Sequence, residues 1–362
     1  MAWFHDLSPF LIEIAPGVGV RWYGLSYAVG FLLGWLWLRR LSRTGVTPMS
    51  EERITDAMLT LVAGVVVGGR LGYVLLYEPE LLMHVGGTFP WWGVLQLNKG
   101  GMASHGGFVG VVIACWLIAR GPKSVEGTFP SRVPFLHVAD CAALTGTLGI
   151  GLGRLANFIN GELLGRVVAP PGEPSPWWSV KFPQEVISGN APALNPDQQE
   201  ALLTLVQPFA GTRPLSESFG PAFDAAYERM LGVIQSGSTQ GQELAVQLAP
   251  LISARHPSQL YQCVAESVVV GGALWWLWRR PRAAGVLTFS FLILYGIGRV
   301  LTEFVRLPDA HLAVQRVGGF SRGQWFSMLM VAIGITALIA LTLRTHRNRA
   351  LPRFGRNSPG TR

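Results

Sequence analysis

The sequence predicts an all-α integral membrane protein with seven transmembrane helices. Apolar residues make up 49% of the 362-residue chain and charged residues only 14%, which is typical of a membrane protein. The thirteen tryptophans fit an interfacial aromatic belt. Seven stretches of roughly 18–25 residues are apolar enough to cross a bilayer core. They lie near residues 20–38, 54–77, 103–119, 135–159, 258–278, 285–305 and 324–343.

Basic residues near the ends of these stretches predict the orientation of the chain. Arginines and lysines gather after the first, third and fifth stretches and in the tail after the seventh, whereas the opposite loops hold Lys99, Arg306, Arg316 and Arg322. Because basic loops stay in the cytoplasm, we expect the N-terminus outside and the C-terminus in the cytoplasm. The basic cluster follows the first stretch, which argues against a cleaved signal peptide. This placement of charge favours anionic lipid over nucleic acid as a partner.

The apolar stretches divide the chain into four predicted parts. Residues 1–166 carry the first four spans, and residues 256–344 carry the last three. Between them, residues 167–255 form an external, periplasmic cap of mixed structure, with weakly helical patterns at 197–208 and 222–250. Residues 345–362 form a basic cytoplasmic tail that we expect to be disordered.

The fourth stretch ends in polar groups that hydrocarbon disfavours. The run from Gly153 to Arg166 reads GRLANFINGELLGR and contains Arg154, Asn157, Asn160 and Glu162. Such groups cost roughly 2.5–3.5 kcal/mol each at the centre of a membrane helix. We therefore interpret the run as a functional site; the alternative is a polar helix end that packs against its neighbours.

Polar residues of six spans fall at the outer end of the bundle in this orientation. They include Tyr23, Arg70, His105, Arg154, Asn157, Asn160, His256, Gln259, Arg299 and Glu303. Guanidinium groups suit phosphate oxygens, so the three arginines indicate an anionic lipid head group. The alternative for each is an ion pair inside the bundle, and Arg299 and Glu303 have the i,i+4 spacing for one. At the opposite end, Asp140 is the clear exception.

His105 is the candidate proton acceptor. Histidine titrates near neutral pH, and the glycines that follow His105 leave space around its ring; the alternative is a packing histidine. Tyr23 and Tyr295 either bind a head group or belong to the interfacial belt. The seven histidines follow no metal-ligand spacing, so we expect no metal and no cofactor. Cys115, Cys141 and Cys263 form no C-x-x-C pair and are expected to be small packing residues.

Glycines with small-x-x-x-small spacing predict close helix packing. These pairs are Gly30 and Gly34, Gly64 and Gly68, Gly106 and Gly110, and Gly149 and Gly153.

At these residues the chain resembles the bacterial phosphatidylglycerol–prolipoprotein diacylglyceryl transferases. The matching pieces occur in family order: RWYGL from Arg21, GGRLGYVL from Gly68, GGM and SHGG around His105, the 153–166 run, HPSQLY from His256, and YG through Arg299 to EFVR at 303–306. The long 153–166 match is the most specific of them.

The resemblance implies a multi-pass enzyme of the bacterial inner membrane. It would transfer the diacylglyceryl group of phosphatidylglycerol to the lipobox cysteine of a prolipoprotein, forming a thioether and releasing glycerol phosphate. Arg154 resembles the arginine that binds the lipid phosphate, Arg299 the second essential arginine, and His105 the catalytic histidine. Other functionally important positions of the family match Tyr23, Asn157, Glu162, Gly165, Tyr295 and Glu303. We also expect Arg70 and Asn160 to bind substrate.

The chain departs from the family pattern in two places. The segment between Arg166 and His256 is longer than the family leads us to expect, and Gln262 stands where the family often has a glutamate. Glu266, one helical turn further on, is a candidate to replace that acid.

Two other functions use the same arginines. A transporter of anionic phospholipid would need polar groups at the inner ends or an inverted repeat, and neither is evident. A non-catalytic lipid-binding membrane protein would have no need of His105. Formation of a covalent product distinguishes the transferase from both.

Overall fold

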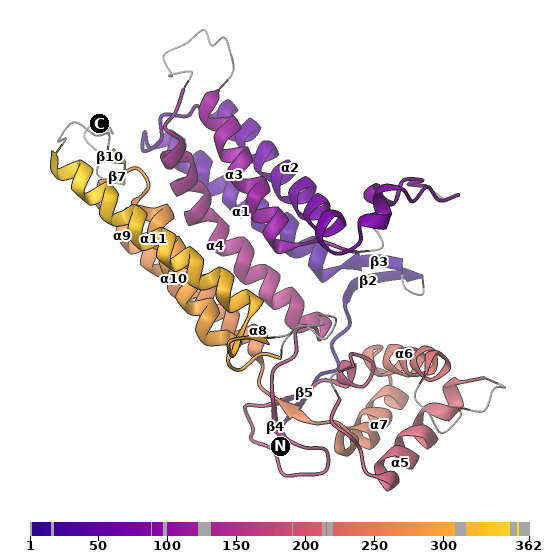
Figure 1. Ribbon diagram of the computed structural model, residues 1–362. Helices are drawn as coiled ribbons and strands as arrows, with labels where there is room; N and C mark the ends of the chain where they lie inside the picture. Colours follow the sequence, from indigo (N-terminus) through magenta and orange to yellow (C-terminus); the bar gives the residue numbers. More distant parts are fainter. Residues whose placement is uncertain are drawn as a thin grey trace. The chain divides into compact units, whose positions relative to one another are not determined.

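The computed structural model is mostly helical (Figure 1). It describes residues 2–15, 18–87, 89–96, 100–121, 132–189, 191–211, 215, 220–307, 316–347 and 353–354. Most of the predicted tail, 345–362, lies outside these residues, as does Lys99. The chain divides into two compact units. Unit 1 comprises Met1–Tyr27, Ile150–Val269 and Tyr295–Met330, and unit 2 comprises Ala28–Gly149, Val270–Leu294 and Val331–Arg362.

Helices occupy all seven predicted apolar stretches. Six are α1 (Trp22–Arg43), α2 (Glu51–Leu76), α3 (Ser104–Arg120), α4 (Phe135–Asn160), α10 (Val286–Glu303) and α11 (Arg322–Arg347). The fifth stretch consists of α8 (Ser258–Gln262), a π-helix η7 (Cys263–Val269) and α9 (Val270–Trp278). The sequence pattern did not indicate the π-helix.

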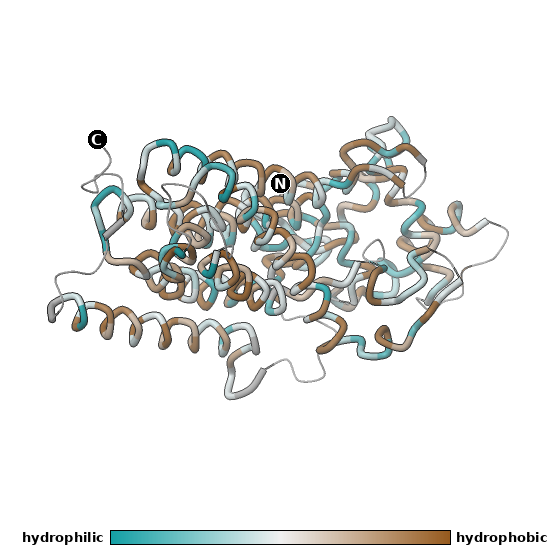
Figure 2. Tube along the Cα trace, turned by 90° about the horizontal axis from the view of Figure 1, so that it is seen from above, coloured by the Kyte–Doolittle hydropathy of each residue, from teal (hydrophilic) through white to brown (hydrophobic). Residues whose placement is uncertain are grey.

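Apolar residues run along these long helices (Figure 2). Among the described residues, five helical segments are long and apolar enough to cross a membrane: Glu51–Leu76, Phe135–Asn160, Ser258–Trp278, Val286–Glu303 and Gly323–Thr345. A shorter apolar helix covers His105–Arg120. The chain therefore has the helices of a multi-pass membrane protein.

In unit 2, α2 and α3 pack backbone to backbone through glycines. A Cβ atom on Gly68 would overlap the carbonyl oxygen of Gly106, and one on Gly110 would overlap that of Gly64. These contacts confirm the packing predicted for the pairs 64/68 and 106/110. Gly149 and Gly153 differ: no described atom lies within 4 Å of the Cβ position of either residue, so spacing alone does not produce a helix contact.

Asp140 on α4 caps the N-terminus of α10 within unit 2. Its carboxylate accepts hydrogen bonds from the backbone N–H groups of Gly285 and Thr288, each at 2.7 Å, and from the Thr288 hydroxyl at 2.6 Å. The first N–H groups of a helix have no partner inside the helix, and a carboxylate is the favoured cap. The polar exception at this end of the predicted bundle therefore has a structural use.

The 167–255 insert belongs to unit 1 and has its own apolar core. It contains α5 (Pro196–Val206), α6 (Pro221–Gln235) and α7 (Thr239–Leu248), which lie together in Figure 1. Buried Leu202, Tyr227 and Leu248 contribute one side chain from each helix. The predicted helical stretch 222–250 is two helices, because Gly237 takes a positive φ of 69° and Ser238 caps α7.

Short strands and 3₁₀ turns complete the described elements, so the all-α prediction holds only for the long elements. One sheet in unit 1 has the order β1 (Trp3–Phe4), β5 (Val180–Lys181), β6 (Ala254–Arg255) and β4 (Val167–Ala169); only the β1–β5 pair is parallel. The two-stranded pairs are β2 (Phe10–Ala15) with β3 (Val18–Arg21), β8 (Arg316–Val317) with β9 (Phe320–Ser321), and β7 (Arg282–Ala283) with β10 (Arg353–Phe354). The 3₁₀ turns are Pro79–Leu82, Gly93–Leu95, Pro183–Glu185, Gln207–Phe209 and Ala249–Leu251.

Candidate active site

Arg154, near the end of α4, forms an ion pair with Glu266 of the π-helix in unit 1. Its Nε and Nη2 atoms donate to one carboxylate oxygen, Oε2 of Glu266, at 3.1 and 2.9 Å. The side chain of Glu266 is fully buried, and that of Arg154 is 16% exposed. The sequence indicates Glu266 only as a candidate to replace the acid that is missing at position 262. The ion pair foreseen as an alternative for Arg154 is therefore present, with a partner that sequence spacing did not identify.

An amide network follows Arg154 along the end of α4. The Asn157 Nδ2 atom donates to the Tyr23 hydroxyl at 2.9 Å and to Oε2 of Glu162 at 3.2 Å, and Asn160 donates to Oε1 of Glu162 at 3.2 Å. The Tyr23 phenol also interacts electrostatically with Glu162 and Arg154. Unit 1 therefore brings together five of the predicted site residues.

The 161–166 loop after α4 is held from several sides. Gly161 and Leu163 have positive φ angles of 66° and 56°. The Ser258 hydroxyl donates to the Leu163 carbonyl at 2.9 Å, and Gln259 donates to the Glu162 carbonyl. Gly165 has no space for a side chain, because an added Cβ would overlap the His256 carbonyl. Steric hindrance therefore requires glycine at position 165, which the sequence predicts to bind substrate.

A buried ion pair supports this loop, and the sequence analysis missed it. Arg255 Nε donates to Glu185 at 2.5 Å, and its Nη1 donates to the Gly165 carbonyl at 3.0 Å. Glu185 also accepts from the backbone N–H of Ser253 at 2.6 Å, and the residues of the ion pair are at most 1% exposed. The sequence shows Glu185 and Arg255 in opposite halves of a long insert. This pattern does not predict that the two side chains form an ion pair.

A second arginine cluster in unit 1 is built on α10. Arg299 Nη1 donates to Glu303 Oε2 at 2.6 Å, as the i,i+4 spacing allowed. Arg306 approaches the same oxygen at 3.5 Å, and the Ser321 hydroxyl donates to Oε1 at 2.9 Å. Two arginines therefore share one carboxylate, which leaves a net positive charge. The Tyr295 phenol forms a hydrogen bond with Arg154 and lies within electrostatic range of Glu266 and Arg299.

Arg70 belongs to unit 2 and is bound by backbone. Its guanidinium donates to the carbonyl oxygens of Gly93, Val94, Gly100 and Gly101 at distances from 2.6 to 3.0 Å. The residue is only 5% exposed. These contacts fold the segment before α3 against α2. These hydrogen bonds to backbone are not the ion pair that was the alternative for Arg70, and they do not indicate a substrate contact.

His105 also belongs to unit 2 and lies in the first turn of α3. The residue is exposed, and α3 begins at the preceding Ser104. The glycines beside it do more than leave space around the ring, because Gly106 packs directly on Gly68 and Gly72 of α2. This backbone contact fixes the helix turn that carries the imidazole.

Two histidines outside the apolar helices lie against the 161–166 loop or against α4, the helix that precedes it. His5 is fully buried, and its Nε2 lies 2.7 Å from the Phe158 carbonyl, so this nitrogen carries the hydrogen. Burial lowers the pKa of His5. Burial and then the charge of Arg166 lower the pKa of His256, whose backbone carbonyl abuts Gly165. Both imidazoles therefore favour the neutral form.

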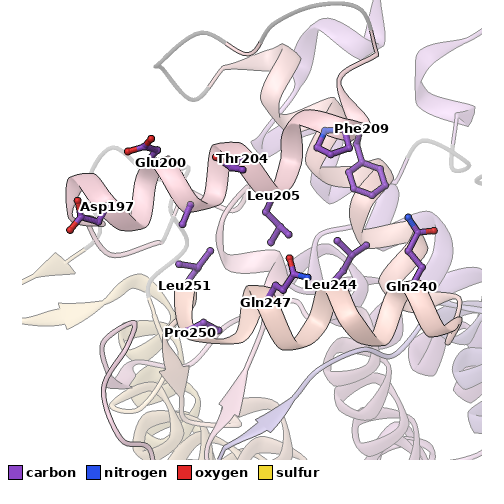
Figure 3. Close-up of a pocket in the computed structure, with 12 residues that line it drawn as sticks. Asp197, Glu200, Thr204, Leu205, Phe209, Gln240, Leu244, Gln247, Pro250 and Leu251 are labelled. Atoms are coloured by element: carbon purple, nitrogen blue, oxygen red, sulfur yellow. The ribbon is translucent and has the colours of Figure 1, made fainter.

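A surface groove of about 710 Å³ lies elsewhere in unit 1. Figure 3 shows it between α5 and α7, with Leu205, Leu244 and Leu251 on its walls and Asp197 and Glu200 along α5. None of the predicted site residues lines it. Among the described residues, no group of three or more His, Cys, Asp or Glu side chains is placed to hold a metal ion.

These features define a helical membrane-type protein that holds arginines beside carboxylates and tyrosines. Guanidinium groups in such a setting can bind and stabilise a phosphate. The fold and site therefore indicate a membrane protein that handles anionic head groups.

The comparisons with known proteins agree with this class. The model of the family described as prolipoprotein diacylglyceryl transferase matches residues 9–340. The chain belongs to this family. The phosphatidylglycerol–prolipoprotein diacylglyceryl transferase of Bdellovibrio bacteriovorus is 38% identical over 357 residues, covering 93% of this chain and 94% of the relative. The proteins of that name from Burkholderia thailandensis and Neisseria gonorrhoeae are 35% and 33% identical, covering 92% and 94% of this chain and 94% and 98% of the relatives.

Proposed function

We propose that this chain transfers the diacylglyceryl group of phosphatidylglycerol to the thiol of a lipobox cysteine in a prolipoprotein. Membership of the family supports the transferase activity, and the names of the relatives supply both substrates. The structural observation that supports it best is that Arg154 and Arg299, both in unit 1, are each oriented by an ion pair with a buried carboxylate. Two guanidinium groups suit one phosphodiester that must gain negative charge during the reaction.

Arg154 and Arg299 bind the phosphate and stabilise the leaving group. The thiolate sulfur attacks the diacylglyceryl carbon that carries the phosphate ester oxygen. A carbon–sulfur bond forms while that carbon–oxygen bond breaks, and the bonding electrons leave with glycerol phosphate. Because Glu266 and Glu303 hold the arginines before substrate arrives, the phosphate meets guanidinium groups that are already oriented.

His105 takes the proton of the thiol, since the thiolate is the nucleophile. The exposure of His105 and the glycine packing of its helix turn support this assignment. His105→Gln should lower turnover at least a hundredfold in detergent, because general base catalysis contributes about 10²–10⁴-fold. Near-normal turnover would exclude His105 as the base.

The other predicted residues shape the site. Tyr23, Asn157, Asn160 and Glu162 orient one another at the end of α4, and Gly165 allows the loop to pass His256. We assign Arg70 to the segment that precedes His105, because it binds that segment through four carbonyls. Glu303 holds Arg299 by an ion pair, and Tyr295 forms a hydrogen bond with Arg154.

The proposed setting is the bacterial inner membrane. Seven helices cross it, with the N-terminus outside and the C-terminus in the cytoplasm, and the 167–255 insert forms a periplasmic cap. The distribution of basic residues supports this orientation.

Mass spectrometry of a lipobox peptide tests the proposal. The purified protein is incubated with the peptide and phosphatidylglycerol, and the expected result is a diacylglyceryl mass increment on the cysteine. Arg154→Ala should abolish the increment. Arg229→Gln, which removes an exposed arginine of α6, is the matched control and should retain it. An unmodified peptide with folded, lipid-bound protein would instead favour transport or lipid binding.

A further inference from the structure

Three buried polar side chains follow one another where the fifth apolar segment begins. Gln259 and Gln262 lie on α8, and Glu266 lies on the π-helix that continues it. All three residues are fully buried. Within the described part of the chain, both amide atoms of Gln262, Oε1 of Gln259 and Oε1 of Glu266 have no hydrogen-bond partner. The row formed by these three side chains therefore presents four unpaired polar atoms in the interior of unit 1.

Burial without a partner is costly, and another buried glutamine of unit 1 avoids it. An unpaired buried polar group costs about 1–3 kcal/mol. Gln324, which is also buried, uses its amide fully: Oε1 accepts from the Ser321 N–H at 2.9 Å, and Nε2 donates to the Val300 carbonyl at 3.3 Å. The contrast with Gln262 indicates that its partners come from a bound molecule. The π-helix points the same way, because such segments frequently occur at functional sites.

Glu266 places this row beside the arginine that we assign to the phosphate. Its Oε2 atom holds Arg154, whereas its Oε1 atom is unpaired. A carboxylate oxygen repels phosphate oxygens but accepts a hydrogen bond from a hydroxyl. The Gln262 amide offers one acceptor and a donor group, and a hydroxyl both donates and accepts. The chemistry therefore suits hydroxyl groups attached next to a phosphate.

We propose that Gln262 and Glu266 form a head-group subsite that binds the glycerol hydroxyls of phosphatidylglycerol. This inference rests on the proposed function, in which that glycerol leaves with the phosphate. Gln262 and Glu266 are then specificity-determining residues: they favour a lipid whose head group carries hydroxyls over one that lacks them. A site built to hydrogen-bond a hydroxyl discriminates strongly against analogues without it, because its polar groups then stay unpaired.

The test compares two lipids with the same acyl chains, phosphatidylglycerol and phosphatidylpropanol, whose three-carbon head group has no hydroxyl. The measured quantity is the ratio of kcat/KM for the two lipids with one lipobox peptide. Gln262→Leu should lower this ratio at least tenfold, which corresponds to about one lost hydrogen bond of 1.4 kcal/mol. Gln262→Glu keeps an acceptor oxygen and should restore most of the ratio.

The melting temperature supplies a second test of the subsite. Because the Gln262 side chain has no hydrogen-bond partner among the described residues, Gln262→Leu should leave the melting temperature of the lipid-free protein unchanged or raise it. Gln324→Leu, the matched control, removes a fully bonded buried glutamine. It should lower the melting temperature while the lipid ratio stays as in the wild type.

The outcomes separate the subsite from the proposed function. If the wild type does not modify the peptide with phosphatidylglycerol, the proposed function fails. If it does, and Gln262→Leu leaves the ratio unchanged, the subsite is wrong. Equal losses on both lipids, or a Gln262→Leu protein that unfolds, would show that Gln262 has only a structural role and would also overturn the subsite.

Discussion

Arg70 in unit 2 is buried and Arg154 in unit 1 is partly buried; both are arginines of apolar helices, but their partners differ. Arg70 binds four backbone carbonyls, which cannot leave without displacing the backbone at residues 93–94 and 100–101. Arg154 binds two side chains: it donates to one oxygen of the Glu266 carboxylate and forms a hydrogen bond with the Tyr295 phenol. Neutral carbonyls satisfy the donors of Arg70 but leave its charge in place, whereas the Glu266 carboxylate balances the charge of Arg154.

The difference teaches that burial of an arginine does not by itself indicate a ligand site. An arginine bound by several carbonyls holds a segment of chain together, and its removal strands all of them. An arginine held by one carboxylate next to unpaired polar atoms can exchange contacts with a substrate at smaller structural cost. The two regions should therefore respond differently to equivalent substitutions.

Arg154→Lys should have the largest effect, and the effect should be on activity. Lysine keeps the charge but loses the planar fork that suits phosphate. We expect kcat/KM to fall by about 10²–10³-fold, the usual cost of losing one transition-state donor. The lipobox-peptide assay gives the rate, and thermal unfolding in detergent should show only a small change. Normal turnover of Arg154→Lys would show that Arg154 does not bind the phosphate, and the contrast between Arg154 and Arg70 would then fail.

Arg70→Met should instead act on stability. The substitution leaves four carbonyl groups without their donor, and we expect a loss of about 3 kcal/mol in the free energy of unfolding. The melting temperature should fall, and the activity should fall with the folded fraction. If Arg70→Met is as stable as the wild type but inactive, Arg70 contacts substrate, as the sequence first suggested.

Gly165→Ala tests how tightly the 161–166 loop is held in place. A methyl group at this position would overlap the His256 carbonyl, so the loop must shift. A displacement of about 1 Å in a catalytic site can cost about a hundredfold in rate, which is the loss we expect in the peptide assay. The control is Gly232→Ala in α6, where no described atom lies within 4 Å of the Cβ position. It should stabilise that helix by about 0.5–1 kcal/mol without loss of activity.

The smallest effect should be a pH dependence of stability from His5. Burial lowers its pKa below the unfolded value of 6.5. As pH falls through that value, the unfolded chain binds a proton before the folded chain does, so stability is lost. The contribution is complete above pH 6.5 and declines below it. The melting temperature of the wild type should therefore drop more between pH 7 and pH 5 than that of His5→Gln, and parallel curves would contradict this role.

The helices of this protein were largely predictable because their signals are local. Helices occupy all seven predicted apolar stretches, five of them long and apolar enough to cross a membrane, and glycine spacing predicted close packing at the residues where α2 meets α3. The break between α6 and α7 also had a local signal, Gly237 followed by Ser238, but the weak periodicity of 222–250 obscured it. The residues of the signature were recognisable because hydrocarbon disfavours them.

The partners of those residues were not predictable in the same way. Arg154 and Glu266 are 112 positions apart, and Glu185 and Arg255 are 70 positions apart. No periodicity connects such pairs, and many carboxylates were available to each arginine. The strand pairing of β1 with β5 and the burial of His5 against Phe158 are equally non-local.

The sequence by itself determined the class of protein, its family, its apolar helices and the polar residues that close them, because each depends on residues close together along the chain. The tertiary structure decided which arginine is bound by backbone, which is held by a carboxylate, and which buried glutamine side chain has no hydrogen-bond partner among the described residues. These choices depend on groups brought together from distant parts of the chain. In an interior where an unpaired charge is costly, the partner decides what each charge can do.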